Sequence, residues 1–239
     1  MALVLPMTAP IAIGSVNRSP KTPSKSKSHA RRGSAVSTKE LAEAQDRLAA
    51  LGFWLESMPA RQALELRAAI MAFQKLESLT PTGRLDQAEL SVLDEAKAPR
   101  PKETGAPHWE VDLDRQVIFW VGAEGAVSKI LPVSTGSGKD FTSGNWTRQA
   151  VTPVGRFYVS KKLEGWQRSP LGMLYYPNFI VGGIAIHGAP SVPGYPASHG
   201  CIRIPMFAAK EFSDITPVGA EVLVYGTVRR QPEPEDDEP

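Results

Sequence analysis

The spacing of hydrophobic residues changes part-way along the chain, and this change most constrains the fold. Over residues 37–96, apolar residues recur every three or four positions, as they do on one face of a helix. Over residues 107–228, stretches of alternating apolar and charged residues occur, as in strands with one buried face. Residues 97–106, which separate the two patterns, are rich in Pro, Lys and Gly and are typical of a linker. The sequence therefore predicts two domains of different structural class.

Capping residues and turn signals divide the first domain into three helices. Ser37 or Thr38 is placed to cap the first helix, and Glu40 is placed to complete a capping box. Two further helices are expected over 60–76 and 87–96, on either side of a turn rich in Thr, Pro and Gly. We therefore expect a small all-α domain of three helices.

The second domain is predicted to be mainly β. Strands are expected over 109–113, 116–121, 128–136, 155–163, 182–188 and 220–226. One segment, 206–215, is predicted to be helical, with Pro205 favourable at its first turn. Many strands with Gly- and Pro-rich connections and a single helix indicate a β-sandwich or a partly open barrel.

Overall composition argues against several classes of protein. The chain has 239 residues, enough to bury a sizeable core, and its formal net charge of +2 gives no indication of a nucleic-acid partner. No run of about 18 apolar residues occurs, so we expect no ordinary membrane-spanning helix. The single cysteine excludes an intrachain disulfide framework. Nothing in the sequence predicts a specific protein partner.

Both ends have compositions typical of disordered segments. Residues 1–36 join an apolar start to a basic stretch rich in Ser, Lys and Pro, which we interpret as a linker. The apolar start lacks the positive charge that opens a secretory signal, so a signal peptide and a disordered start are equal alternatives. Residues 229–239 form an acidic tail.

One short segment, "AIHGAPSVPGYPASHGCIRI" over 185–204, holds the single cysteine and two of the four histidines. A cysteine attacks as its thiolate, so a catalytic thiol needs a base nearby. His199 lies two residues before Cys201, and in an extended segment both side chains point to one side. His187 ends a predicted strand, and the short Gly- and Pro-rich loop after it can return it to Cys201. The N–H groups of Gly200 and Cys201 are placed to face a developing oxyanion.

Two other interpretations of this segment stay open at this point. A lone cysteine is more often an inert buried residue than a nucleophile. A cysteine with two histidines is also a partial set of zinc ligands, but such a site needs a fourth ligand or an open position. Taken by composition alone, the inert cysteine is the most common case.

The helical domain resembles the peptidoglycan-binding-like domain of bacterial wall enzymes. The matching residues are "LAALGF" (48–53), "AAIMAFQKLESLTPTGRLD" (68–86) and the closing Leu90 and Leu93. Where that family often has a Gly- and Asp-rich loop, this chain has "WLESMPARQALEL". The resemblance implies the fold, while binding of glycan or peptide and a plain helical spacer both stay open.

The cysteine segment resembles the signature of the L,D-transpeptidase (YkuD-type) catalytic domain. That signature is a His, a spacer, then Ser/Thr-His-Gly-Cys, an apolar residue and Arg or Asn. It matches this chain at His187, Ser198, His199, Gly200, Cys201, Ile202 and Arg203. "TPVGRFYV" (152–159) and "SPLGMLYYP" (169–177) extend the resemblance, which covers residues 107–227. The spacer of ten residues after His187 is short for the family and implies a tight loop over the site.

The resemblance implies roles for the central residues of this motif. Cys201 is the nucleophile and acyl carrier, and His187 is the base that activates it. Gly188 has no side chain, so its backbone carbonyl or another group must orient His187. His199 and Gly200, with the Cys201 N–H, would shape the oxyanion hole.

Ser198 has a structural interpretation, and Arg203 and Tyr176 each have a functional and a structural one. Ser198 hydrogen-bonds locally and sets the turn. Arg203 contacts a substrate carboxylate or braces the loop in an ion pair. Tyr176 lines the donor cleft or packs as an ordinary core aromatic.

The activity implied by the resemblance is a two-step acyl transfer on peptidoglycan stem peptides. The cysteine displaces the terminal D-Ala of a tetrapeptide, and an amine of a neighbouring stem resolves the thioester to a 3→3 crosslink. The mechanism needs no metal, nucleotide or other cofactor, and carbapenems are expected to acylate the thiol. Such a protein is expected to be exported to the cell envelope or wall space. An L,D-carboxypeptidase and a non-catalytic peptidoglycan-binding scaffold are the alternatives.

Overall fold

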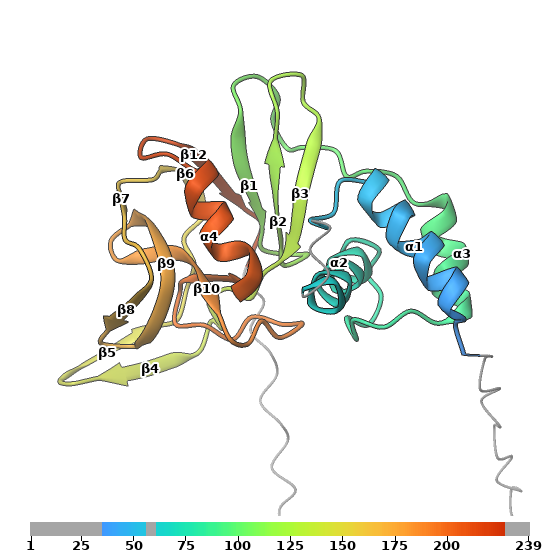
Figure 1. Ribbon diagram of the computed structural model, residues 1–239. Helices are drawn as coiled ribbons and strands as arrows, with labels where there is room; N and C mark the ends of the chain where they lie inside the picture. The colour runs from blue at the N-terminus through green and yellow to red at the C-terminus, as the bar shows by residue number, and fades with distance from the viewer. Residues whose placement is uncertain (1–34, 56–60, 228–239) are drawn as a thin grey trace, which may run out of the picture. The chain divides into compact units, whose positions relative to one another are not determined.

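The computed structural model describes residues 35–55 and 61–227, and Figure 1 shows its ribbon. The signal-like start, almost all of the basic linker and the acidic tail lie outside the described residues. Within the described ranges, three helices come first and a mainly β domain with one further helix follows, which confirms the predicted fold class. None of the helices in these ranges is long and apolar enough to cross a membrane.

The first three helices are α1 (Thr38–Ala50), α2 (Gln62–Leu76) and α3 (Gln87–Glu95). Helix α1 begins with the predicted capping box, in which the Ser37 side chain accepts the Glu40 N–H and the Glu40 carboxylate accepts the Ser37 N–H. A second capping box, between Asp86 and Glu89, begins α3 and was not predicted. Local side-chain chemistry therefore determines where two of the three helices start.

The first sheet has the strand order β3-β2-β1-β12-β6. Its members are β1 (His108–Asp112), β2 (Val117–Val121), β3 (Val127–Pro132), β6 (Gly155–Tyr158) and β12 (Glu221–Tyr225). β1 runs parallel to β12, so the beginning and the end of the β domain pair with each other. The other neighbours in this sheet are antiparallel. The sequence predicted all of these strands, but the expectation that β1 is half-buried was wrong: it is buried on both faces, Glu110 and Asp112 included.

The second sheet has the order β11-β10-β9-β7, with β8 also paired to β9. Its members are β7 (Lys161–Lys162), β8 (Trp166–Ser169), β9 (Gly172–Val181), β10 (Ile184–Ala189) and β11 (Ile202–Pro205). A separate hairpin pairs β4 (Asp140–Ser143) with β5 (Trp146–Gln149). The sequence did not predict β4, β5, β8, β9 or β11. The β5 residues are exposed on both faces, so no apolar alternation marks that strand.

One hydrophobic core joins both sheets and the helix α4 (Met206–Ile215). Trp109 of β1 is fully buried, and its ring centroid lies 4.5 Å from that of Phe212 of α4. Ile186 of β10 and Ile202 of β11 belong to the same cluster. Of the two predicted descriptions, the sandwich fits, because two separate sheets share one core, and an isolated bridge joins Ser134, which follows β3, to Arg203 of β11.

A second hydrophobic core is shared by the helical domain and the first sheet. It combines Leu48 of α1, Phe73 of α2 and Leu93 of α3 with residues of β2 and β3, among them Phe119 and Ile130. All five of these side chains are at most 1% exposed. The outer face of the sheet is thus covered by helices that lie earlier in the chain.

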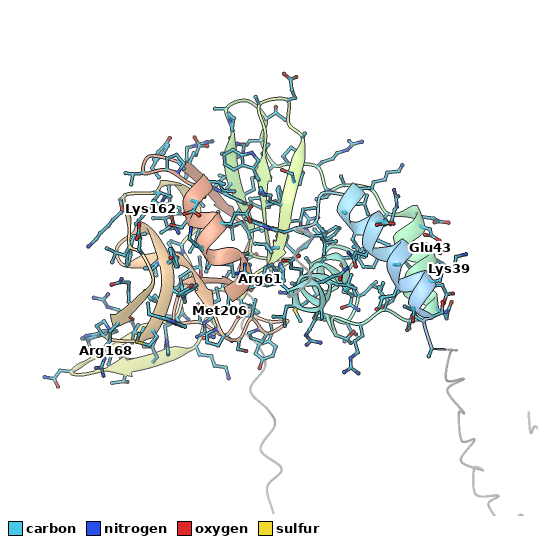
Figure 2. All side chains as sticks on the ribbon, in the orientation of Figure 1. Lys39, Glu43, Arg61, Lys162, Arg168 and Met206 are labelled. Atoms are coloured by element: carbon cyan, nitrogen blue, oxygen red, sulfur yellow. The ribbon has the colours of Figure 1, made fainter. Side chains whose placement is uncertain are left out.

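Polar contacts also join the helical domain to the β domain. Arg61, which Figure 2 labels near Met206, directly precedes α2, and its Nη1 donates to the Phe207 carbonyl oxygen at 3.3 Å. A β-bridge connects Phe53 with Ile130 of β3. The helices therefore pack onto the β domain as part of one folded unit.

Candidate active site

Strands β10 and β11 bring the predicted catalytic residues together. The two strands pair in parallel, with His187 directly opposite Arg203. Cys201 directly precedes β11 and so lies beside Ala185, two residues before His187 on the neighbouring strand. Residues two apart in a strand point to the same face, and this offset corresponds to a Cα separation of about 8 Å. The thiol, the imidazole and the guanidinium therefore share one face of the sheet.

The Cys201 thiol is half-buried at this face. Its Sγ lies 3.9 Å from the Gly183 carbonyl oxygen, and the Ala185 N–H donates toward the sulfur. Burial raises the pKa of the Cys201 thiol, and the Ala185 N–H and the Arg203 charge only partly oppose this effect. The thiol is therefore protonated at neutral pH and needs a base before it can attack.

His187 has the position and the protonation state of such a base. Its ring is buried, and Nδ1 lies 2.9 Å from the Gly188 carbonyl oxygen. Because a carbonyl oxygen can only accept, we assign the proton to Nδ1, which leaves the lone pair on Nε2. Burial lowers the pKa of His187 to about 4, the Arg203 charge adds to this, and the Gly188 hydrogen bond opposes it. The ring is neutral at pH 7, the form that accepts a proton.

Gly188 is required at its position by packing. A Cβ at this position would lie 2.6 Å from Cβ of Ala209 on α4 and 3.1 Å from Cδ1 of Tyr175 on β9. Neither neighbour can move away easily, because both lie in or against the close-packed core between the sheets and α4. Because residue 188 has no side chain, the group that holds His187 in the structure is the Gly188 main-chain oxygen. The sequence had left open whether this carbonyl or another group holds the ring.

Ser198 and Gly200 form a tight turn before the cysteine. The Ser198 hydroxyl donates to the Cys201 carbonyl oxygen at 2.5 Å and accepts the Gly200 N–H at 3.0 Å. Gly200 has φ +131°, and a Cβ there would meet the Val151 carbonyl oxygen at 2.9 Å. Glycine is thus needed for both conformation and space. The Gly200 N–H, which the sequence placed at an oxyanion, is bonded to Ser198 in this structure.

His199 and Tyr176 contact aromatic side chains of different strands. The His199 side chain is exposed, and its ring centroid lies 4.6 Å from that of Phe141 on the β4–β5 hairpin. Tyr176 packs edge-on against Tyr175 with ring centroids 4.8 Å apart, and it adopts a left-handed φ of 48°. A non-glycine residue in this region is strained, and such strain is often found where side chains line a site.

Arg203 faces both reacting side chains. Its positive charge lowers the pKa of His187 and of Cys201. Its backbone N–H and carbonyl pair with Ser134, at 3.0 and 3.1 Å, so the main chain already braces the loop. Within the described ranges, no carboxylate forms a salt bridge with its guanidinium. The side chain is available to contact an anionic group at this face.

Three positioning residues were not singled out by the sequence. Thr152 Oγ1 donates to the Gly200 carbonyl oxygen at 2.7 Å and accepts the Gly136 N–H at 2.9 Å. The sequence signal at Thr152 was the Thr-Pro-x-Gly motif, which predicted only where a strand begins. Gln116 and Thr135, which hold the other side of the turn, have no local signal, because their partners are distant in sequence.

The two best-defined hollows of the described surface lie away from Cys201. The larger, about 770 Å³, lies in the helical domain and is lined by Arg67, Leu79, Arg84, Glu89, Val92 and their neighbours. A smaller one, about 190 Å³, lies between α2 and the start of α4. Within the described ranges, no three His, Cys, Asp or Glu side chains come together as they would to hold a metal ion. The thiol of Cys201 and the imidazole of His187 are therefore the candidate reactive groups of this site.

Comparison with known families gives two matches that together cover most of the chain. Residues 106–224 match the L,D-transpeptidase catalytic domain, and residues 37–93 match a putative peptidoglycan binding domain. No curated protein matches the chain.

Solved structures give the same result for the fold. An L,D-transpeptidase from Xylanimonas cellulosilytica is 32% identical, with a TM-score of 0.73, over 87% of this chain and 100% of that chain. An L,D-transpeptidase from Stackebrandtia nassauensis shares the fold at 21% identity and a TM-score of 0.50, over 83% of this chain and 96% of that chain. Together these similarities show that the chain belongs to the L,D-transpeptidase family, with a peptidoglycan-binding domain before the catalytic one.

Proposed function

We propose that the protein is a cysteine-dependent peptidoglycan L,D-transpeptidase with Cys201 as nucleophile and His187 as general base. The observation that carries the proposal is the hydrogen bond of His187 Nδ1 to the Gly188 carbonyl, at 2.9 Å. It leaves the free lone pair on Nε2 of a side chain that lies on the same sheet face as Cys201. An inert buried cysteine needs no oriented imidazole beside it.

The first half of the proposed reaction is acylation of the thiol. The thiol proton passes to His187 Nε2 as Sγ attacks the carbonyl carbon between the third stem residue and the terminal D-Ala. The tetrahedral intermediate collapses as its C–N bond breaks and His187 returns the proton to the leaving amine. Free D-Ala leaves, and the acyl group stays on Cys201 as a thioester.

The second half transfers the acyl group to an amine. The amine nitrogen of a neighbouring stem attacks the thioester carbonyl and gives its proton to His187. The C–S bond breaks, the new amide forms, and the thiolate takes the proton back from His187. The product is a 3→3 crosslink, and the enzyme returns to its neutral thiol and imidazole.

The surrounding residues have supporting roles in this proposal. The oxyanion is assigned to the Cys201 N–H and the exposed His199 ring, because the Gly200 N–H is bonded to Ser198. Arg203, with no carboxylate partner in the described ranges, is assigned to the carboxylate of the terminal D-Ala. Tyr176 is assigned to the wall of the donor cleft.

The place of action follows from the substrate. Peptidoglycan lies outside the cytoplasmic membrane, so we assign the protein to the envelope or wall space. The helical domain matches a putative peptidoglycan binding domain, which supports a second contact with the wall.

The test of this proposal is intact-mass measurement after incubation with a carbapenem. Wild-type protein is expected to gain one adduct, and Cys201→Ala is expected to gain none. His187→Gln keeps the thiol but lacks the base, so its adduct is expected to form at least about a hundredfold more slowly. Folded wild-type protein that gains no adduct would favour a non-catalytic scaffold instead.

A second measurement separates transfer from hydrolysis, since both share the thioester. Incubation with a tetrapeptide donor and an amine acceptor is expected to give a crosslinked product by mass spectrometry. Release of a tripeptide in place of the crosslink, even with acceptor present, would identify an L,D-carboxypeptidase.

A further inference from the structure

A buried lysine of the helical domain reaches into the catalytic domain. Lys75 lies in the last turn of α2 and is 6% exposed. Its Nζ donates to the carbonyl oxygens of Gln116, at 3.1 Å, and Val133, at 2.7 Å. Burying an amine is unfavourable unless hydrogen bonds replace its water. These two carbonyls supply the replacement, so the lysine and the catalytic domain constrain each other.

The two carbonyls belong to segments at one end of the β2–β3 pair. Gln116 directly precedes β2 and Val133 directly follows β3, and the Val133 N–H donates to the Gln116 carbonyl at 2.9 Å. Gln116 has a left-handed φ of 56°, a conformation that persists in a non-glycine residue only where its surroundings hold it. Lys75 is one of the groups that hold it.

The side chain of Gln116 continues the contact toward the active site. Its Oε1 accepts the Thr135 N–H at 3.0 Å, and its Nε2 donates to Thr135 Oγ1 at 2.7 Å. Gln116 is 4% exposed and Thr135 is fully buried, so water does not compete for these bonds. The orientation of Gln116 therefore determines the position of Thr135.

Residues 134 and 135 hold the loop of Cys201 on both sides. The Thr135 carbonyl accepts the N–H groups of Ala197 and Ser198, at 3.0 and 2.9 Å, directly before the turn. Ser134 pairs with Arg203 through two backbone hydrogen bonds, directly after it. A continuous series of buried hydrogen bonds thus leads from Lys75 to both flanks of the cysteine.

We propose that Lys75 is a positioning residue for the loop that carries Cys201, so that α2 of the helical domain forms part of the support of the active site. The catalytic consequence of this role rests on the proposed function, whereas its structural consequence rests on geometry alone. An unbranched apolar side chain such as methionine would fill most of the same space but would leave both carbonyls without this donor. The loop would keep its fold and lose the precision with which it presents the thiol.

Lys75→Met is the variant that tests this role, and the chain offers a matched control. Lys162, labelled in Figure 2, is a partly buried lysine. Like Lys75, it donates to a backbone carbonyl, here that of Ser213 on α4. Its partner is not part of the series of bonds described above. Lys162→Met therefore removes the same kind of hydrogen bond without touching the Cys201 loop.

Hydrogen–deuterium exchange of the full chain gives a measurement that does not depend on activity. In Lys75→Met, the amides of residues 197–200 are expected to exchange about tenfold faster, while those of β12 remain unchanged. Lys162→Met is expected to leave residues 197–200 as in wild type. Faster exchange throughout the chain, or none at 197–200, would overturn the proposal. Should Lys75→Met not fold, Lys75→Gln, whose shorter amide reaches fewer carbonyls, is judged by the same criterion.

The rate of carbapenem acylation then tests the catalytic consequence. Lys75→Met is expected to lower the maximal acylation rate about tenfold, with half-saturation unchanged, because attack geometry and not binding is affected. Combining it with Thr135→Val is expected to add less than the sum of the two effects, since both act on one series of bonds. Wild type without any adduct refutes the proposed function, and exchange at 197–200 still decides the role of Lys75. Wild type that is acylated while Lys75→Met matches it in rate and exchange refutes the role of Lys75 alone.

Discussion

At the scale of single residues, the active site pairs two groups that are both neutral at rest. Burial lowers the pKa of His187 to about 4 and raises that of Cys201. A thiolate–imidazolium pair would need the opposite shifts. In the proposed reaction the proton is therefore transferred during attack, so that separated charges are not held in a buried place at rest.

The reactivity of Cys201 toward iodoacetamide is expected to rise with pH through the alkaline range. Because His187 stays neutral down to about pH 4, no imidazolium promotes the thiolate between pH 5 and 8. The measurement is the alkylation rate against pH, followed by intact mass, with Cys201→Ala as the blank. A plateau of full reactivity beginning near pH 5 would instead demonstrate a preformed ion pair.

Substituting Gly188→Ala is expected to destabilise the fold by about 1–3 kcal/mol, because the new methyl overlaps the packed core. Its Cβ would lie 2.6 Å from that of Ala209. Gly122→Ala is the matched control, since its Cβ would meet its nearest neighbour, the Ala126 carbonyl oxygen, at an ordinary 3.6 Å. Denaturant unfolding of both variants checks this difference, and equal stability would contradict it.

At the scale of elements, the site consists of a parallel strand pair and a turn held from outside. β10 and β11 determine the face and spacing of His187 and Cys201. The turn between them gains its shape from Ser198 within the loop and from Thr152 outside it. Neither strand alone determines the conformation of the turn. That conformation depends on contacts with other parts of the chain.

Thr152→Val is expected to slow acylation of Cys201 and to cost about 1–3 kcal/mol of stability. The change keeps the shape but leaves the buried Gly200 carbonyl and Gly136 N–H without their shared partner. Thr227→Val is a suitable control, because the one described partner of that hydroxyl is the exposed Asp114 carboxylate. Thermal unfolding and acylation kinetics measure the two effects, and a Thr152→Val protein as fast and stable as the control would refute them.

At the scale of the whole molecule, the helical domain is built into the catalytic domain. Phe73 and Leu93 share a core with Phe119 and Ile130 of the first sheet. Burial of these side chains contributes on the order of 2 kcal/mol each. Lys75 extends this contact to the carbonyl oxygens of Gln116 and Val133 in the catalytic domain.

The stability difference between wild type and Lys75→Met is expected to change in favour of wild type as pH rises from 7 to 10. Burial lowers the pKa of Lys75 from 10.5 to about 7, so over this window the unfolded chain binds a proton that the folded chain does not. Folding is then favoured by up to about 1.4 kcal/mol per pH unit in wild type only. Denaturant unfolding of both proteins across this range measures the slope, and a constant difference would show that the lysine stays charged when buried.

How far the sequence could predict this protein differs between the fold and the site. The local residue pattern predicted the three helices, the strands of the first sheet and α4. It did not predict that β1 and β2 are buried on both faces, because the helices that cover the outer face come from another part of the chain. It missed the β4–β5 hairpin, which is largely exposed, β9, whose apolar run is interrupted by Pro177, and β11, which has only four residues. The motif at His187 and Cys201 pointed to the chemistry, because reactive residue types at fixed spacing are visible in one short segment.

The sequence by itself determined the class of each domain and the segment that holds the thiol and the imidazoles. Tertiary structure alone decided that the Gly188 carbonyl holds His187, that the Gly200 N–H is bonded to Ser198, and that Lys75 meets the support of the loop. The physical reason is the distance along the sequence between the groups that interact. Periodicity and capping depend on neighbours a few residues apart, whereas the buried hydrogen bond of Lys75 to Val133 joins groups 58 residues apart that only the packed core brings together. The bonds of His187 and Gly200 are local, but the strands and the turn that select them are held by contacts from elsewhere in the chain.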